Sequence, residues 1–598
     1  MSYAFKSVSA SFADSYKQAI ASNSDRNFVS VHSVRGDLTQ KSFSEFDLDV
    51  RRVQKFILQL GFKPKQVVTL AANEYEHLVY IVASWLLGIS HCPINPQETP
   101  ERVRDKIQAL GGRSLVFYSK LVAEASAYAT APDFYPLVIP SLDAAADLYS
   151  SLFSGPMTLI FTSGTTGYSK IVPQDEISIM ANVDCLIQRH SINSKTVICT
   201  PLPVFHVNAL HFSFLACLLT GSKLVLLESF LLPQAWQIIE AEKVQILSVV
   251  PQIIQHMVKS FDSSQKYDVS SLKYLVSAAA PLSSSLANEF YNIFGLKIIQ
   301  GFGLSEAVNF SCLIPVDISE ANYKKFVLEA RFPSIGTALE CNEVTLLEGQ
   351  IVLSGINVMQ GYTNEGDVKS VVNGKFATGD LGYFETDEQG QNYFFISGRI
   401  KDVIKRNGMT VSLREIDEVI SLYTADLFDA VTVPIDHQNL GEDLGVAVKY
   451  EGDNRENFET DFKKYLDSKL PPHMRPSLIV FTAGSLRTPS GKPLRWQLKS
   501  LFTEFKSASS ASTIYVDSLS WQSIEKVFRT IFRNQKIQLK AEMSSLDIEG
   551  WDSLTHLEII MALESEFKIQ FKPQEVLSFK NVGELYELII KKTKGAEL

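Results

Sequence analysis

The chain has 598 residues, of which 45% are apolar and 20% are charged. These proportions are typical of an ordinary globular protein and exclude collagen, a long coiled coil and global disorder. At about 150 residues per domain, this length predicts about four folding units. The formal net charge of −10 argues against bulk nucleic-acid binding, because neutralising phosphates requires clustered Lys and Arg.

The cysteines and the N-terminal segment indicate a reducing compartment. The six cysteines are scattered and form no C-x-x-C pair, so neither a disulfide framework nor a zinc site is indicated. Residues 1–20 lack the apolar segment of a signal peptide. The longest stretch without a charged residue, 196–222, contains prolines and histidines and predicts a buried strand, loop and helix. We therefore expect a cytoplasmic protein without a membrane span.

The first half of the chain alternates between apolar helices and strands. The spacing of apolar residues predicts a helix from Ser44, as its N-cap, to Leu60, with Gly61 ending it. An apolar run at 67–72 precedes a second helix around 77–87. Further strand-length runs, most of them separated by helix-length segments, lie at 115–118, 157–161, 223–227, 246–250 and 274–276. This alternation predicts a layered α/β fold with largely parallel sheets.

The second half changes rhythm from about residue 335, where short strands and turns follow one another. Turn signals occur at Glu348-Gly349, Asn373-Gly374 and Gln389-Gly390. A smaller α+β unit extends to about 503, and residues 506–513 form a polar linker. The last 80 or so residues keep helical spacing and predict a small helical bundle.

A loop rich in Gly, Ser and Thr follows the apolar run at 157–161. Its candidate phosphate-binding residues are Thr162, Ser163, Gly164, Thr165, Thr166, Gly167 and Lys170. Such a loop offers backbone N–H groups, hydroxyls and one positive charge to a polyphosphate. The spacing does not fit a Walker A motif. The composition alone is equally consistent with a flexible surface loop.

The order of residues in this loop resembles the phosphate loop of the adenylate-forming superfamily, which includes acyl-CoA synthetases, luciferases and nonribosomal peptide adenylation domains. One departure is Ser169-Lys170, where the family usually has Pro-Lys. Further motifs follow in the family's order at 203–206, 301–306, 376–380, 398–408 and 488–495. The resemblance covers roughly residues 30–503. It implies an enzyme that joins a carboxylate to the α-phosphate of ATP and expels pyrophosphate.

The resemblance also implies roles for individual residues in ATP binding. Glu306 would hold Mg²⁺, a hard cation that prefers carboxylate oxygen. Asp380 would accept from both ribose hydroxyls, and Arg399 would donate to the ribose from the hinge side. Phe302, Gly303 and Ser305 would complete the nucleotide site, and Thr166 would act in catalysis. The alternatives are a capping or surface Glu306, a turn-forming Asp380 and a surface ion pair of Arg399.

Two further catalytic roles come from the same resemblance. Lys492 would insert between the carboxylate and the α-phosphate during adenylation; considered alone, it is a solvated loop lysine. His206 would be the gate residue near the carboxylate; its alternative is a core histidine. In this family the small domain rotates about a hinge, here Lys401-Asp402, so that the segment near Gly408 lines the approach of the thiol.

The residues near the acid pocket, by resemblance, are His206, Val207, Asn208, Gly301, Asn309 and Phe310. The amino-acid-activating branch usually has an Asp where this chain has Val207, and that Asp pairs with the substrate's α-ammonium. Burying an ammonium without a carboxylate is costly. We therefore expect a carboxylic acid substrate that lacks an α-amino group.

The C-terminal unit resembles an acyl or peptidyl carrier domain. The triplet Asp552-Ser553-Leu554 matches the attachment site of 4′-phosphopantetheine, with Ser553 as the modified residue. A helix N-cap is the alternative explanation of Asp552-Ser553. A carrier domain implies two partners, which are a phosphopantetheinyl transferase and a downstream acyl-accepting biosynthetic enzyme.

Together these expectations define an organisation and a function. The predicted domains are an N-terminal adenylation core at 1–399, a mobile subdomain at 400–503, a linker at 504–517 and a four-helix carrier at 518–598. The predicted activity uses ATP and Mg²⁺ to form an acyl-adenylate and loads the acid on the pantetheine arm at Ser553. The alternatives are a ligase that uses free CoA and a non-catalytic adenylate-binding scaffold.

Overall fold

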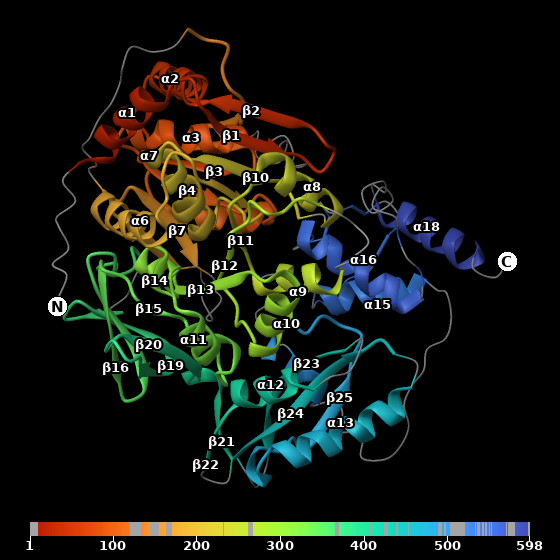
Figure 1. Cartoon of the computed structure of the whole chain (residues 1–598). Helices are drawn as coiled ribbons and strands as arrows, with labels where there is room; N and C mark the ends of the chain where they lie inside the picture. Colours follow the sequence, from red (N-terminus) through yellow and green to blue (C-terminus); the bar gives the residue numbers. More distant parts are fainter. Residues whose placement is uncertain are drawn as a thin grey trace. The chain divides into compact units, whose positions relative to one another are not determined.

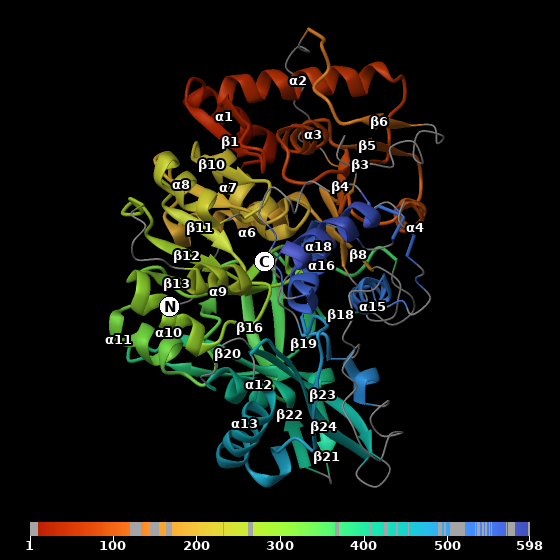
Figure 2. The ribbon, with the colours of Figure 1, turned by 90° about the vertical axis from the view of Figure 1, so that its right-hand side faces the viewer.

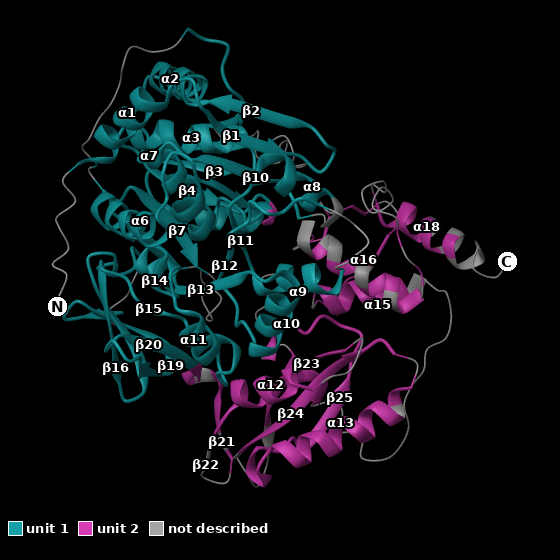
Figure 3. Ribbon diagram, in the orientation of Figure 1, with its two compact units in different colours: residues 1–96, 100–396 teal, residues 97–99, 397–598 magenta. Residues whose placement is uncertain are grey.

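The computed structural model divides into two compact units, residues 1–96 with 100–396 and residues 97–99 with 397–598 (Figure 3). The structure describes residues 10–119, 133–143, 153, 155–162, 170–230, 232–260, 267–364, 370–406, 409–423, 428–437, 441–452, 454–487, 493–495, 498–502, 521–532, 534, 537, 539–540, 543–544, 547–548, 551, 553–567, 569, 571 and 581–595. The sequence-based domain boundaries stay predictions.

The first unit is built around a nine-stranded sheet with the order β15-β14-β13-β12-β11-β9-β10-β1-β2 (Figure 1). The six strands from β13 to β1 pair in parallel, and antiparallel strands close both edges. The strands are β1 (Asn27–His32), β2 (Leu38–Ser42), β9 (Val197–Thr200), β10 (Lys223–Leu227), β11 (Ile246–Val249), β12 (Tyr274–Ser277), β13 (Lys297–Gly303), β14 (Phe310–Leu313) and β15 (Thr337–Ala338). The predicted α/β fold with parallel sheets is confirmed.

A second sheet of six strands has the order β6-β5-β3-β4-β7-β8. Only its last pair, β7 with β8, is antiparallel. Its strands are β3 (Gln66–Leu70), β4 (Ser90–Ile94), β5 (Ser114–Tyr118), β6 (Phe134–Pro136), β7 (Thr158–Thr162) and β8 (Lys170–Gln174). The antiparallel hairpin β7–β8 places the two ends of the predicted phosphate loop side by side.

Helices pack on these sheets and bury one large apolar core. The longer helices are α1 (Phe12–Asn23), α2 (Phe43–Gln59), α3 (Tyr75–Leu86), α4 (Pro100–Leu110), α6 (Glu176–His190), α8 (Leu232–Glu242), α9 (Pro251–Lys259) and α10 (Ser284–Phe294). Helices α1, α2 and α3 pack against one another (Figure 2). The predicted N-cap of α2 was wrong: Ser42, not Ser44, caps it, because Ser42 and Glu45 exchange hydrogen bonds in a capping box.

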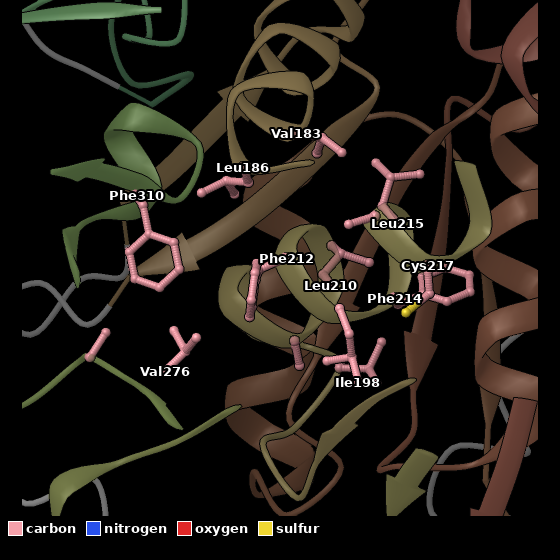
Figure 4. Packing of buried hydrophobic residues seen from close by; sticks show 14 of the residues in the cluster. Val183, Leu186, Ile198, Leu210, Phe212, Phe214, Leu215, Cys217, Val276 and Phe310 are labelled. Carbon is pink, nitrogen blue, oxygen red and sulfur yellow. The ribbon is translucent and has the colours of Figure 1, made fainter. Parts of the chain in front are cut away.

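The predicted buried strand, loop and helix at 196–222 are present, with an unusual helix. After β9 comes the π-helix η1 (Asn208–Leu215), followed by α7 (Ala216–Thr220). Wide helical turns of this kind occur frequently at functional sites. Figure 4 shows side chains of η1 and α6 packed with residues of β9, β12 and β14 in the core.

A third, antiparallel sheet completes the first unit. Its order is β16-β17-β19-β18, with β20 also paired to β19. The strands are β16 (Asn342–Leu347), β17 (Gln350–Gly355), β18 (Val371–Val372), β19 (Lys375–Thr386) and β20 (Asn392–Arg399), of which β20 runs on into the second unit. All three predicted turns have positive φ at glycine: Gly349, Gly374 and Gly390.

The second unit begins with a small α+β fold. Its five strands are β21 (Val403–Arg406), β22 (Met409–Ser412), β23 (Phe428–His437), β24 (Gly441–Tyr450) and β25 (Leu478–Phe481), with helices α12 (Leu413–Ser421) and α13 (Arg455–Lys469). Three C-terminal helices are described, α15 (Trp521–Ile531), α16 (Ser553–Phe567) and α18 (Val582–Gly595). The predicted linker lies outside the described residues.

All six cysteines are buried and none is in a disulfide. In the described part of the chain, no helix combines the length and apolarity needed to cross a bilayer.

Candidate active site

The predicted phosphate loop connects β7 and β8. Thr162 and Lys170 pair directly across the hairpin, so both ends of the loop are fixed by the sheet. Ser163, Gly164, Thr165, Thr166 and Gly167 lie outside the described residues. An exposed cation, Lys170, therefore stands at the start of β8.

Lys170 and Glu306 are brought together by Tyr362. The Nζ atom of Lys170 lies 4.4 Å from the centre of the Tyr362 ring, a cation–π distance. The Tyr362 hydroxyl donates to Glu306 Oε1 at 2.7 Å. Thr363 and Asn364 hydrogen-bond the backbone of Ile171, which holds this segment beside β8. Tyr362 was missed from the sequence, because no motif contains it.

The carboxylate of Glu306 fits the role of a magnesium ligand. It is half-buried and carries the kind of oxygen that Mg²⁺ prefers. Among the described residues no group of three or more His, Cys, Asp and Glu side chains forms a metal cage. Mg²⁺ is usually bound by one or two carboxylates together with substrate phosphates. One carboxylate, linked through Tyr362 to Lys170 at the end of the predicted phosphate loop, fits that pattern.

The loop that carries Glu306 is held at every carbonyl from 305 to 308. Gln174 Nε2 donates to the carbonyls of Ser305 at 2.8 Å and Val308 at 3.1 Å. The Met359 N–H donates to the carbonyl of Glu306, and Asn357 Nδ2 donates to that of Ala307. These four hydrogen bonds hold the backbone of the loop, which has little regular structure.

Backbone strain is stored in the same loop. Val308 has φ 65° and ψ −62°, and the Asn309 N–H donates to the Ala307 carbonyl at 2.7 Å. This is a γ-turn of the rare positive-φ type. It is particularly unfavourable for a β-branched residue, and such strain costs about 1–3 kcal/mol and is concentrated at functional sites.

The two glycines of the motif are required by close approach. A Cβ on Gly303 would lie 1.7 Å from the Asn309 carbonyl oxygen, and a Cβ on Gly301 would lie 2.4 Å from the Phe310 ring. Phe302, between them, is buried. The turn at 304–309 can fold back on β13 only because both positions lack a side chain.

The loop after β9 positions His206. The buried Asn73 donates to the carbonyls of Pro201, Leu202 and Leu227 and accepts from the Val204 N–H. His206 is exposed, so the core-histidine alternative is wrong. Asn73 carries no motif signal and was missed from the sequence.

The predicted acid-pocket residues lie just before and at the start of η1, on β13, and just before and at the start of β14. Val207 packs on the main core, and the Ser248 hydroxyl donates to Asn208 Oδ1 at 3.1 Å. Asn309 is 3% exposed, and its Nδ2 has no hydrogen-bond partner among the described residues. The Phe310 ring covers Gly301 and meets the Phe212 ring edge-on, with centroids 6.0 Å apart (Figure 4).

Asp380 lies in a bulge of β19. Residues 378–380 of β19 face Ile351 alone on β17, and Gly379 takes φ 78°. The Asp380 N–H donates to the Thr378 hydroxyl, which donates to the Ile351 carbonyl. Asp380 itself is 3% exposed. A bulge re-aims side chains and often adjoins an active site, so both the turn-forming and the functional interpretation agree with this geometry.

In the second unit, the buried Arg495 contacts Asp402, a residue of the predicted hinge, and lies three residues after Lys492 in the sequence. Arg495 donates to the Thr432 carbonyl at 2.7 Å and pairs with Asp417 at 2.6 Å, and its Nε lies 3.6 Å from Asp402 Oδ2. Arg399 is exposed. Lys492, Gly408 and the Lys401 side chain lie outside what the structure describes.

Ser553 is the first residue of α16. Two residues before it, Trp551 is 5% exposed and packs edge-on against Phe528 with centroids 4.9 Å apart. Trp551 therefore anchors the chain where α16 begins.

Comparisons with known proteins agree with this geometry. The sequence matches the family described as "AMP-binding enzyme" over residues 16–363 and the family described as "Phosphopantetheine attachment site" over residues 526–589. Rice (Oryza sativa subsp. japonica) 4-coumarate–CoA ligase 5 is 27% identical over an alignment of 490 residues, and the match covers 77% of this chain and 89% of the relative. 4-Coumarate–CoA ligase 1 of Narcissus pseudonarcissus is 26% identical over an alignment of 499 residues, and the match covers 77% of this chain and 88% of that relative.

Solved structures share the fold. O-succinylbenzoate CoA synthetase of Bacillus subtilis in complex with its acyl-adenylate intermediate has a TM-score of 0.70 at 19% identity, covering 84% of this chain and 99% of that one. ATP-bound MatB from Rhodopseudomonas palustris has a TM-score of 0.71 at 20% identity, covering 82% and 99%.

The fold and the site thus define an adenylate-forming, acid-activating ligase with a carrier domain at its C-terminus. The chain belongs to the AMP-binding enzyme family. As an AMP-forming ligase it uses ATP and Mg²⁺, and its second family match adds a phosphopantetheine group.

Proposed function

We propose that the chain adenylates a carboxylic acid without an α-amino group and then loads it on the pantetheine arm of its own Ser553. The observation that carries this proposal is the presence of both modules in one chain: an AMP-binding enzyme at 16–363 and a phosphopantetheine attachment site at 526–589. A tethered acceptor reaches a high effective concentration at the activating site.

In the first half-reaction, the substrate carboxylate attacks the α-phosphorus of ATP and pyrophosphate leaves. Thr162, Ser163, Gly164, Thr165, Thr166, Gly167 and Lys170 bind the phosphates. Glu306 holds Mg²⁺, and Phe302, Gly303, Ser305, Asp380 and Arg399 bind the rest of the nucleotide. Lys492 stabilises the charge that develops between the two anions.

In the second half-reaction, the arm's thiol attacks the acyl carbonyl and AMP leaves. Rotation of the small domain about Lys401-Asp402 brings the segment near Gly408 to the thiol's approach. Arg495 supports this role of the hinge, because it pairs with Asp402 and lies three residues after Lys492.

The character of the acid follows from the pocket residues His206, Val207, Asn208, Gly301, Asn309 and Phe310. Val207 packs on the apolar core, so an α-ammonium placed there would lose water without gaining a carboxylate partner. A fatty, unsaturated, aryl or small dicarboxylic acid meets this requirement.

A second candidate is a ligase that uses free CoA, with the carrier acting later. It is favoured by the curated relatives, which are themselves CoA ligases. Both candidates need a phosphopantetheinyl transferase and a downstream acyl-accepting enzyme as partners of the carrier.

An intact-protein mass spectrum separates these possibilities. The full chain is treated with a phosphopantetheinyl transferase and CoA, and then with ATP, Mg²⁺ and a pool of carboxylic acids. We expect a pantetheine increment followed by an acyl increment, both lost in Ser553→Ala. Lys492→Ala should retain the pantetheine increment and lose the acyl one.

Other results would redirect the proposal. Acyl-CoA in solution without an acylated protein would support the free-CoA ligase. Failure of every acid to release pyrophosphate would support a non-catalytic scaffold. A protein-bound thioester in Ser553→Ala would refute the loading site.

A further inference from the structure

A buried amide on β8 contacts the loop that carries Glu306. Gln174, the last residue of β8, is 2% exposed. Its Nε2 group donates to the carbonyls of Ser305 and Val308, which stand on either side of Glu306-Ala307. One side chain thus ties both ends of the segment that presents the magnesium carboxylate.

The other end of the same amide contacts the fully buried His211 on η1. The distance between Gln174 Oε1 and His211 Nε2 is 2.8 Å. Both N–H bonds of the Gln174 amide point to carbonyls, so its oxygen must accept and the Nε2 atom of His211 must carry the proton. The Nδ1 atom of His211 has no partner among the described residues, which agrees with a neutral imidazole held in this tautomer.

We infer that Gln174, oriented by His211, is a positioning residue that keeps Glu306 in the geometry required for Mg²⁺. The inference rests on the magnesium role proposed for Glu306. Its physical basis is the strained turn at Val308, where a φ of 65° makes this loop conformation unfavourable by itself. The turn persists because surrounding donors over-determine it, and Gln174 supplies two of them.

The same contacts connect Glu306 to the acid side of the site. Asn208 and His211 belong to the same π-helix, and Asn208 accepts from Ser248 while His211 donates to Gln174. The side chain that orients Gln174 is therefore carried by the element that presents the acid-pocket residue Asn208.

The test measures equilibrium binding of ATP to the full-length protein by calorimetry, once with Mg²⁺ and once with EDTA, without acid and therefore without turnover. The wild-type chain should bind ATP more tightly with Mg²⁺. Gln174→Met keeps the side-chain length and removes all three hydrogen bonds, so we expect it to reduce this magnesium-dependent gain about tenfold. His211→Asn, which is too short to reach Gln174, should reduce the gain in the same direction.

Gln66→Met is the matched control. Gln66 is a fully buried amide on β3 whose Nε2 donates to Gly111 and Ser114, remote in sequence from the Glu306 loop. It should lower the melting temperature as Gln174→Met does, but keep the magnesium-dependent gain. A purely structural role for Gln174 would make the two variants alike, and this result would overturn the inference.

Glu306→Gln separates the inference from the proposal on which it rests. If Glu306→Gln retains the full magnesium-dependent gain, the proposed role of Glu306 is wrong. If Glu306→Gln loses the gain while Gln174→Met keeps it, only the positioning role is wrong. If Gln174→Met does not fold, an unchanged gain in His211→Asn refutes the inference.

Discussion

The buried histidines of the first unit make its stability sensitive to acid, and His77 provides the sharpest test. Its Nδ1 contacts the Ala72 carbonyl, and its Nε2 contacts the Thr69 hydroxyl, which also contacts His91. Burial lowers the pKa of His77 from 6.5 to about 4. We therefore predict that His77→Asn, which keeps a side-chain donor for the Ala72 carbonyl, flattens the acid dependence of stability.

The sign and size follow from proton linkage. Because the pKa of His77 is lower in the folded chain, the unfolded chain binds this proton first as the pH falls. Stability is unaffected above about pH 6.5, decreases below it and reaches its full loss below about pH 4. The pKa difference corresponds to about 3 kcal/mol in total, of which about 2 kcal/mol is lost by pH 5. Burial also lowers the pKa of His91, His190 and His211, so the wild-type chain loses more than this amount.

The assay is urea unfolding of the full chain at pH 7.5 and pH 5, followed by tryptophan fluorescence, to which the buried Trp85 on the same helix contributes. The difference in unfolding free energy between the two pH values should be about 2 kcal/mol smaller in His77→Asn than in the wild type. His206→Asn, at an exposed position, should keep the wild-type difference. Equal differences in the wild type and His77→Asn would refute this explanation.

Three further changes test the site. Gly303→Ala places a Cβ 1.7 Å from the Asn309 carbonyl oxygen, so acid-dependent pyrophosphate exchange should fall about 100-fold. Gly155→Ala is the control, because the nearest atom to its Cβ would be 4.0 Å away, and it should leave the exchange rate unchanged. Phe310→Ala removes a ring from the predicted acid pocket, so the exchange rate with larger acids should rise about tenfold relative to that with smaller acids. An unchanged acid preference would show that Phe310 does not line the pocket. Trp551→Ala should destabilise the carrier by about 3–5 kcal/mol, measured by unfolding, and reduce phosphopantetheinylation of the serine two positions later; full modification of a stable carrier would contradict this.

The sequence predicts function and local structure best where the residues involved lie close together in the chain. The order of six motifs predicted the activity, and the alternation of apolar runs predicted the parallel sheets. The N-cap of α2 is also encoded locally, because Ser42 and Glu45 have the capping-box spacing. Such signals are readable because they depend on local periodicity and on fixed short spacings.

The sequence by itself determined that this protein activates an acid with ATP and carries a phosphopantetheine attachment site. Only the tertiary structure decided how the site is held. Asn73, Gln174, His211 and Tyr362 have no local signal for this role. Gln174 meets Ser305 across 131 residues of sequence, and such contacts arise because buried loop carbonyls must find donors. Which donor reaches which carbonyl depends on the elements that packing places side by side, and no short spacing in the sequence encodes that.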